Sequence, residues 1–230
     1  MTEAEIKRGR PHNAEGAREA ILNAAEKVFS EHGFAGARID DIAAAAGYNK
    51  GLIFRYFGDK LRLYLEVIRR VDAATRGMEA QVIAYLMEED ILHDPQRVAA
   101  LVKTFIGEVF DYYLENPGVM RILQWEMAEG WQNYRQIAQQ IDDADFERMK
   151  PLLARLQKAG LLRSEFDPQA QIITAIFQPI LFLGLLSFYP IFSAAGDMQT
   201  AREFMIEFVA GGLLAGPADT DSEIQTKKEA

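Results

Sequence analysis

The segment Ile39–Asp59, IDDIAAAAGYNKGLIFRYFGD, constrains the fold of this chain more than any other stretch of its sequence. Small apolar residues at helical spacing come first, and Gly47 then supplies the permissive backbone that ends a helix sharply. Asn49 is a favourable N-cap for a second helix. In that helix Ile53 and Phe57 lie four residues apart, so they share one inward face. The segment therefore predicts a helix-turn-helix.

The remainder of the chain also has helical periodicity. Apolar residues recur three and four positions apart, and neither the alternation of strands nor the turn dipeptides of hairpins is present. We therefore expect an all-α fold, in which Pro151 and Pro179 kink or split the helices that contain them. Besides the two helices of the motif, the expected helices cover 17–32, 59 to about 71–76, 77–92, 96–114, 117–129, 131–159, 168–192 and 199–214.

The formal net charge of −9 is distributed unevenly along the 230 residues. Through Arg76 there are 13 Lys and Arg residues against 11 Asp and Glu, whereas the rest of the chain has 12 against 23. The N-terminal part is therefore +2 and the remainder −11. This distribution permits a nucleic-acid surface near the N-terminus, and the acidic remainder is expected to face away from phosphate.

The composition excludes several kinds of site. The sequence has no cysteine, and its three histidines do not stand at the spacing of metal sites or catalytic triads. Neither a glycine-rich phosphate loop nor a nucleophile elbow is present. We therefore expect no enzyme activity and no cofactor. The absence of cysteine and of an apolar signal segment after Met1 favours a cytoplasmic location.

The stretch Pro168–Gly196 has no charged residue across 29 positions, which is long enough to span a bilayer. Three glutamines, two prolines after Pro168 and flanking aspartates argue against a membrane span. We expect instead that this stretch is buried between a core and a partner subunit, with no membrane contact.

Two stretches, ILNAAEKVFSEHGF and DDIAAAAGYNKGLIFRYFGDK, occur in this order within Ala17–Val71. This quarter of the chain resembles the DNA-binding domain of the TetR family, the tetracycline-repressor-like transcriptional regulators. The most specific part is the glycine-led turn followed by Lys50-Gly51 and the pair Tyr56-Phe57. The resemblance implies that the helix Asn49–Phe57 is a recognition helix that enters the major groove of double-stranded DNA.

Carried over position by position, the resemblance implies a set of DNA-binding residues. Arg55 is suited to a guanine edge or a phosphate, and Leu52 to a thymine methyl group. Arg38 stands where the family commonly has a capping threonine, and Phe54 replaces a common tyrosine. Taken singly, the aromatic residues would more often belong to a core, and the lysines and Arg55 would be solvated surface charges; their joint placement around a glycine turn favours DNA binding. The full set is Arg38, Asn49, Lys50, Gly51, Leu52, Phe54, Arg55, Tyr56 and Lys60, in which Tyr56 and Lys60 are expected to clamp phosphates.

The central helices are rich in aromatic residues, with two glutamates among them. A ligand pocket is mostly apolar with a few polar groups, so this mixture fits one, although an ordinary core with surface glutamates remains open. The resemblance implies a small-molecule pocket in this region. The candidates for its lining are Phe105, Trp125, Glu126, Glu129, Trp131 and Phe177.

The last two apolar helices match the place where the family forms its dimer, although the same faces could be buried within one subunit. The residues expected at a four-helix interface are Leu181, Leu185, Phe188, Phe204, Phe208 and Leu213.

The expected organisation has four parts. They are a flexible basic arm at 1–16, a helix-turn-helix DNA-binding domain at 17–76 with the motif at about 40–59, a larger helical ligand-binding and dimerisation domain at 77–216, and a disordered tail at 217–230. The expected function is that of a homodimeric repressor, released from a palindromic operator by a small apolar or amphipathic effector. A DNA-binding regulator without a small-molecule ligand, controlled by a protein partner, is the alternative. A helical enzyme or membrane-associated protein that merely contains the turn motif is the third interpretation.

Overall fold

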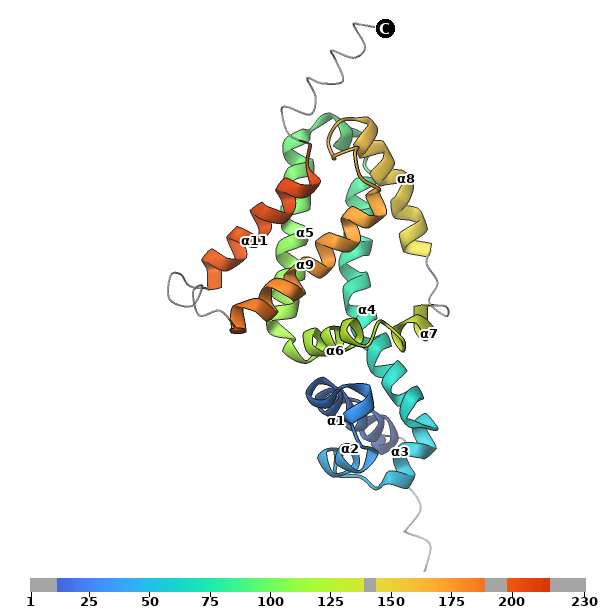
Figure 1. The fold of residues 1–230 in the computed structure, drawn as a ribbon. Coiled ribbons are helices and arrows are strands. Elements are labelled where there is room, and N and C mark those ends of the chain that lie inside the picture. The colour runs from blue at the N-terminus through green and yellow to red at the C-terminus, as the bar shows by residue number, and fades with distance from the viewer. Residues whose placement is uncertain (1–11, 139–143, 189–197, 216–230) are drawn as a thin grey trace, which may run out of the picture. The chain divides into compact units, whose positions relative to one another are not determined.

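The structure, a computed structural model, is all-α, as expected from the sequence (Figure 1). It describes residues 12–138, 144–188 and 198–215. Residues 1–11 of the arm predicted at 1–16 and the tail predicted at 217–230 lie outside the described residues, whereas residues 12–16 are helical. The helices in chain order are α1 His12–Gly36, α2 Ile39–Ala46, α3 Lys50–Phe57, α4 Lys60–Leu86, the short η1 Glu89–His93, α5 Pro95–Glu115, α6 Pro117–Ala128, α7 Tyr134–Ala138, α8 Ala144–Lys158, α9 Pro168–Phe188 and α11 Met198–Leu213.

The contacts between residues divide the chain into two compact units. The first comprises Met1–Ala73 and Pro117–Ile141, and the second Ala74–Asn116 and Asp142–Ala230. This division differs from a boundary at residue 76 because α6 packs along α1, and Ile122 of α6 enters the core of the first unit. The functional roles of the expected domains remain predictions.

The core of the first unit is built from α1, α2, α3, α6 and the start of α4. The apolar residues at helical spacing on α1 are buried, and Phe29 among them meets the ring of Tyr64 edge-on at 4.7 Å. Each large apolar side chain buried in this way stabilises the fold by roughly 1.5–3 kcal/mol. The residues with no exposed surface here are Ile21, Ala25, Phe29, Ile42, Ile53, Leu63, Tyr64, Val67, Ile68 and Ile122.

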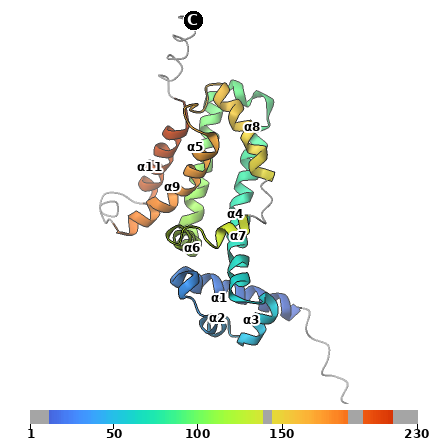
Figure 2. The same ribbon diagram turned by 45° about the vertical axis from the view of Figure 1, so that its right-hand side comes forward.

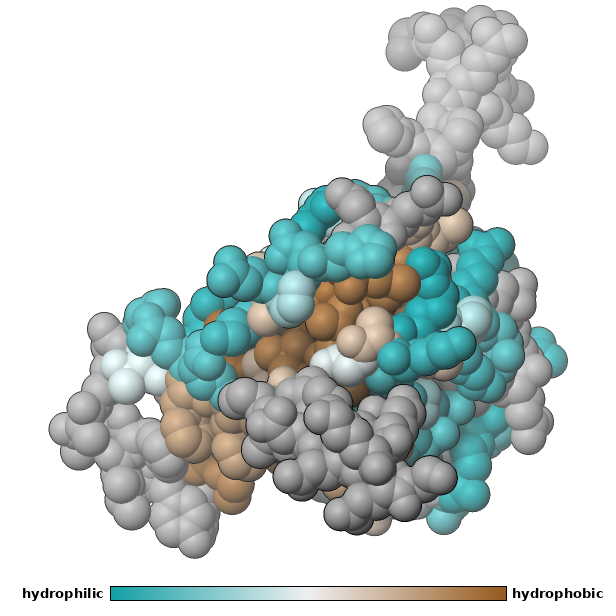
Figure 3. All heavy atoms as spheres, turned by 90° about the horizontal axis from the view of Figure 1, so that it is seen from above, coloured by the Kyte–Doolittle hydropathy of each residue, from teal (hydrophilic) through white to brown (hydrophobic). Residues whose placement is uncertain are grey.

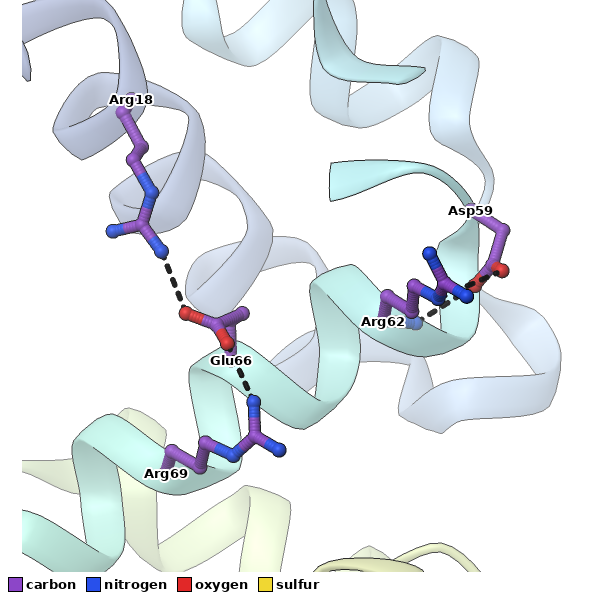
Figure 4. A network of polar contacts seen from close by, with 5 residues as sticks. All are labelled: Arg18, Asp59, Arg62, Glu66 and Arg69. Atoms are coloured by element: carbon purple, nitrogen blue, oxygen red, sulfur yellow. Dashed lines mark hydrogen bonds and ion pairs between the residues drawn. The ribbon is translucent and has the colours of Figure 1, made fainter. Parts of the chain in front are cut away.

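Polar contacts link α1 to α4 on the exposed side of this unit (Figure 4). The Glu66 carboxylate accepts a hydrogen bond from Arg18 of α1 and one from Arg69, each at 2.6 Å. About two turns earlier, Asp59 accepts from the backbone N–H of Arg62 at 2.8 Å, so Asp59 is the N-cap of α4. These contacts hold the start of α4 against α1, directly after the helix-turn-helix.

Two predicted helix boundaries are wrong. The helix that starts at residue 60 does not end near 71–76 but continues to Leu86, because buried residues such as Ile83 and Leu86 extend its apolar face and one interior glycine, Gly77, costs only about 1 kcal/mol. The predicted helix 17–32 begins earlier, at His12, within the predicted arm. The predicted helix 131–159 contains α7 and α8, and its residues 139–143 lie outside the described residues.

A glycine near the end of α1 and the prolines inside α8 and α9 test further predictions about the helices. Gly33 ends the regular part of α1 as predicted, since its φ is 66° and its ψ 179°. Neither helix is split at its proline, because α8 continues through Pro151 and α9 through Pro179. A kink at these two positions remains a prediction.

In the second unit α5 packs against both α9 and α11, and the two views in Figures 1 and 2 show these three helices side by side. Arg202 of α11 donates two hydrogen bonds to the Asp111 carboxylate of α5, both at 2.7 Å. Gly107 permits this approach, because a Cβ at that position would lie 2.6 Å from the Arg202 guanidinium. Lys103 and Glu207 form a further ion pair at 2.6 Å between the same helices.

Helix α9 is, among the described residues, the one helix long and apolar enough to cross a membrane by length and composition. Ala175, Ile180 and Leu183 on it are buried within the unit. An exposed apolar set remains on α9 and α11, and Figure 3 shows apolar side chains gathered in a continuous area bordered by hydrophilic ones. The exposed set consists of Ile173, Leu181, Leu185, Met198, Phe204 and Phe208.

Two residues expected at the dimer interface do not belong to this set. Leu213 is 7% exposed and lies in the core of its own unit, because it faces inward from the last turn of α11. The side chain of Phe188 is outside the described residues.

Candidate functional site

The turn of the helix-turn-helix has the predicted geometry. Gly47 is in the left-handed region, with φ 71° and ψ 24°, and its N–H donates to the carbonyl groups of Ala43 and Ala44. The N–H of Tyr48 donates to the Ala43 carbonyl at 3.1 Å, which closes the end of α2. Asn49 then caps α3, because its side-chain oxygen accepts from the Leu52 N–H at 2.9 Å.

Helix α3 has one buried and one exposed face. Ile53 and Phe57 are 0% and 5% exposed, and they attach the helix to the core of the first unit. The half-buried Leu52 and Tyr56 also pack against this core. Of the predicted DNA-binding residues, the exposed ones are Arg38, Asn49, Lys50, Gly51, Phe54 and Arg55.

A shallow open hollow of about 450 Å³ lies at the N-terminal end of α3. Its walls come from the start of α1, through Ala14 and Ala17, and from the turn and α3, including Asn49 and Tyr56. Gly51 also lines this hollow, and a Cβ there would lie 3.3 Å from the Asn49 cap oxygen. The first turn of a helix presents N–H groups that favour an anion, so the hollow can accept a phosphate.

The cationic side chains of α3 already have partners within the chain. The Lys50 ammonium lies 3.0 Å from a carboxylate oxygen of Asp40 on α2. The Arg55 guanidinium lies 5.6 Å from the ring centre of Tyr56, in a cation–π arrangement. Both cations stay at the exposed surface, where a nucleic acid can reach them.

Lys60 points toward the end of α1. Its ammonium lies 4.8 Å from the ring centre of Phe34 and donates to the Ala35 carbonyl at 3.4 Å. Burial lowers the pKa of Lys60, and the nearby Glu129 carboxylate partly offsets this. A phosphate contact by Lys60 therefore requires its ammonium to leave the Phe34 ring, and the phosphate clamp remains a prediction.

Arg38 precedes α2 in an extended conformation. Its side chain makes no capping hydrogen bond, in line with the inability of arginine to cap, and it is exposed. It therefore remains a candidate for a phosphate contact.

Glu126, a predicted ligand contact, is enclosed by its own unit. The carboxylate has no exposed surface and accepts hydrogen bonds from Tyr64 O–H at 2.8 Å, from Asn133 Nδ2 at 3.0 Å and from the Tyr134 N–H at 2.9 Å. Burial, followed by the bond to Glu126, raises the pKa of Tyr64. Because three internal donors occupy the carboxylate, Glu126 ties α6 and the segment after it to α4.

The other predicted ligand contacts near Glu126 also lie in the first unit. Trp125 donates from Nε1 to the Ser30 carbonyl at 3.3 Å, and its indole covers Gly33 of α1. Trp131 has a positive φ of 62° and meets the ring of Tyr134 edge-on at 5.5 Å. Glu129 is half-buried near Lys60.

Phe105 and Phe177, in contrast, belong to the second unit, so the six predicted ligand contacts fall into two groups. Phe105 lines a closed apolar cavity of about 40 Å³, whereas Phe177 is half-buried on α9. Val82, Leu153 and Ile172 also line this cavity, from α4, α8 and α9. Sequence reasoning missed these aliphatic residues, because their helical spacing indicates a core and nothing more specific.

A larger, open groove of about 510 Å³ runs between α9 and α11. Its lining is mainly apolar and includes Phe166, Ala175, Phe208 and Val209. Gln171 lies in the wall of both this groove and the closed cavity, and its Oε1 is buried without a hydrogen-bond partner among the described residues.

Two family models match the chain. The model "Bacterial regulatory proteins, tetR family" matches residues 21–67, which contain α2 and α3. The model "Tetracyclin repressor-like, C-terminal domain" matches residues 99–206.

Curated relatives and solved structures agree with these matches. The chain is 30% identical to the HTH-type transcriptional repressor NicS of Pseudomonas putida over 162 residues, which are 68% of this chain and 70% of NicS. It is 33% identical to the repressor SCO4008 of Streptomyces coelicolor over 47% of this chain and 48% of that protein. A TetR family transcription regulator from Marinobacter aquaeolei VT8 has the same fold, with a TM-score of 0.65 and 18% identity over 89% of this chain and 99% of that one.

Proposed function

This chain belongs to the tetR family of bacterial regulatory proteins, and from that premise we propose that it is a homodimeric transcriptional repressor that binds a palindromic operator. Relatives that carry the same DNA-binding region, among them NicS and SCO4008, are named transcriptional repressors. A repressor of bacterial genes acts in the cytoplasm, and we place this protein there.

The observation that carries the proposal is the exposed face of α3. The helix has eight residues and is therefore about 12 Å long, which suits a major groove about 12 Å wide. Its buried residues fix its orientation, whereas Lys50, Gly51 and Arg55 remain exposed at one surface with Phe54. Lys50 and Arg55 are suited to base edges or phosphates, and Gly51 lets the backbone approach closely.

The exposed apolar residues on α9 and α11 support dimerisation. Six large apolar side chains, each more than 40% exposed, extend along two neighbouring helices. A two-fold contact would bury them against the same residues of a second copy and form a four-helix interface. Such a dimer presents two copies of α3, which can meet half-sites about 34–36 Å apart on one side of DNA.

The apolar interior of the second unit supports a response to a small apolar or amphipathic effector. The closed cavity is small, because ligand sites usually enclose roughly 300–1,000 Å³, so an effector has to widen it or use the α9–α11 groove. An effector that binds the operator-free state more tightly shifts the protein toward that state, with a coupling of about 1–3 kcal/mol in typical cases.

The small cavity volume also favours a second candidate function. A regulator without a small-molecule effector needs no large pocket, and it could instead answer to a protein partner. A thermal-shift screen of apolar compounds separates the two. Compounds that raise the melting temperature and also lower operator affinity favour the effector, whereas stabilisation without any change in operator affinity argues against it.

The DNA-binding proposal is tested by capturing genomic fragments on the immobilised full-length protein and sequencing them. We expect enrichment of a short inverted repeat. Recovery of fragments without a shared sequence would exclude a specific operator.

A further inference from the structure

The structure brings two residues of the helix-turn-helix together that the sequence does not pair. Asp40 belongs to the first turn of α2, and Lys50 is the first residue of α3, ten positions later. The Lys50 ammonium lies 3.0 Å from one carboxylate oxygen of Asp40 and 3.1 Å from the other. Both side chains are about half exposed, so the pair lies at the surface that also carries the exposed residues of α3.

The helix dipoles act differently on the two members of this pair. Asp40 lies at the N-terminus of α2, where the helix dipole stabilises a carboxylate. Lys50 lies at the N-terminus of α3, where the dipole destabilises an ammonium. Asp40 therefore offsets the unfavourable position of Lys50 and holds its ammonium between the starts of the two helices. Lys50 thus meets DNA as one half of an ion pair.

We propose that Asp40 is a specificity-determining residue, which penalises non-operator DNA through its pair with Lys50. This inference rests on the proposed binding of DNA by α3. On DNA that offers only phosphates, the Asp40 carboxylate repels the backbone and competes with phosphate for the Lys50 ammonium. On an operator, Lys50 gains a donor contact to a base edge such as guanine O6 or N7, which offsets the disturbed pair. Specificity then includes a repulsive element that acts against wrong sites.

The effect on non-operator DNA is measurable. Exposed ion pairs of this kind correspond to about a 1.4- to 5-fold change in an equilibrium constant. Removal of the Asp40 charge is therefore expected to raise the affinity for non-operator DNA. The increase should be about 2- to 5-fold larger than the increase caused by removing a neighbouring charge that forms no ion pair. Lys50 then neutralises one more phosphate, so the slope of log affinity against log salt steepens by about 0.9.

The neighbouring residue Asp41 supplies a matched control. It lies in the same turn of α2, is exposed, and forms no ion pair among the described residues. Asp41→Asn therefore changes the charge by the same amount as Asp40→Asn while leaving the Lys50 pair intact.

The experiment measures binding of the full-length protein to a fluorescein-labelled duplex of mixed sequence by anisotropy over a series of NaCl concentrations. The proteins are the wild type, Asp40→Asn, Asp41→Asn, Lys50→Gln and the double variant Asp40→Asn/Lys50→Gln. Thermal unfolding followed by circular dichroism accompanies each variant, because a purely structural role of Asp40 would alter the melting temperature and leave the salt slope unchanged.

We expect Asp40→Asn to bind the mixed duplex more tightly than Asp41→Asn, with the steeper salt slope. In the Lys50→Gln background the substitution at Asp40 should act no more strongly than that at Asp41. Equal affinities and slopes for Asp40→Asn and Asp41→Asn would overturn the inference while leaving DNA binding by α3 intact. A wild-type protein without salt-dependent binding would overturn the proposed function as well, so the two failures are distinguishable.

Discussion

Replacement of Glu126 by alanine is expected to destabilise the first unit strongly. The alanine leaves the hydroxyl of Tyr64, the amide of Asn133 and the backbone N–H of Tyr134 without their acceptor. Each buried donor left unsatisfied costs about 1–3 kcal/mol, and water entering the vacated space offsets part of this. We therefore expect the free energy of unfolding to fall by about 3–5 kcal/mol.

Two further variants separate the network from the loss of volume. Glu126→Gln keeps the shape and one acceptor oxygen, so its loss should be smaller, about 1–2 kcal/mol. Glu129→Ala removes a half-buried carboxylate just after the same helix, outside the network, and should change stability by less than about 0.5 kcal/mol.

Unfolding in urea, followed by tryptophan fluorescence, measures these losses. The chain has two tryptophans, Trp125 and Trp131, and both belong to the first unit, so the signal reports on that unit. An unfolding midpoint for Glu126→Ala equal to that of Glu129→Ala would refute the structural role of the carboxylate.

Three further outcomes follow from the site, the interface and the buried tyrosine. Arg55→Ala should weaken operator binding by about 1–3 kcal/mol if the guanidinium makes a bidentate base contact, as measured by fluorescence anisotropy with a captured genomic fragment. An unchanged affinity would show that Arg55 makes no base contact. Phe208→Glu should convert the dimer to a monomer in sedimentation velocity, because its side chain is 60% exposed in one subunit and would lie in the interface; a persisting dimer would exclude this surface. Because the pKa of Tyr64 is raised in the folded protein, the unfolded chain loses the tyrosine proton first, so the free energy of unfolding should fall above about pH 10, the ordinary tyrosine value. In urea unfolding at pH 9 to 11, Tyr64→Phe should show a smaller fall than the wild type. Equal dependence of the two proteins on pH would contradict this.

The parts of the fold that were predicted correctly depend on neighbouring residues. The glycine turn, the Asn49 cap and the spacing of Ile53 and Phe57 are all defined within eleven residues, so the sequence predicts α3 to its ends. The end of α4 was wrong because no local signal there is strong: Gly77 permits a break, and only burial farther along shows that the helix continues.

The parts that were missed depend on contacts between distant residues. Glu126 remains a predicted ligand contact, but its hydrogen bond with Tyr64 was missed, because Tyr64 is 62 positions away and no periodicity links the two. Lys60 matches the family pattern in sequence, whereas its ammonium lies over the Phe34 ring, 26 positions before it. Side-chain direction and long-range pairing follow from packing, which a pattern of residue types does not specify.

The central claim is that paired copies of α3 read a two-fold operator. Hydroxyl-radical footprinting of a captured genomic fragment tests this most directly. We expect two protected patches related by the inverted repeat and separated by about one helical turn or a multiple of it, both of which weaken together in Arg55→Ala. Uniform protection along the fragment, or an unchanged footprint in Arg55→Ala, would contradict the claim.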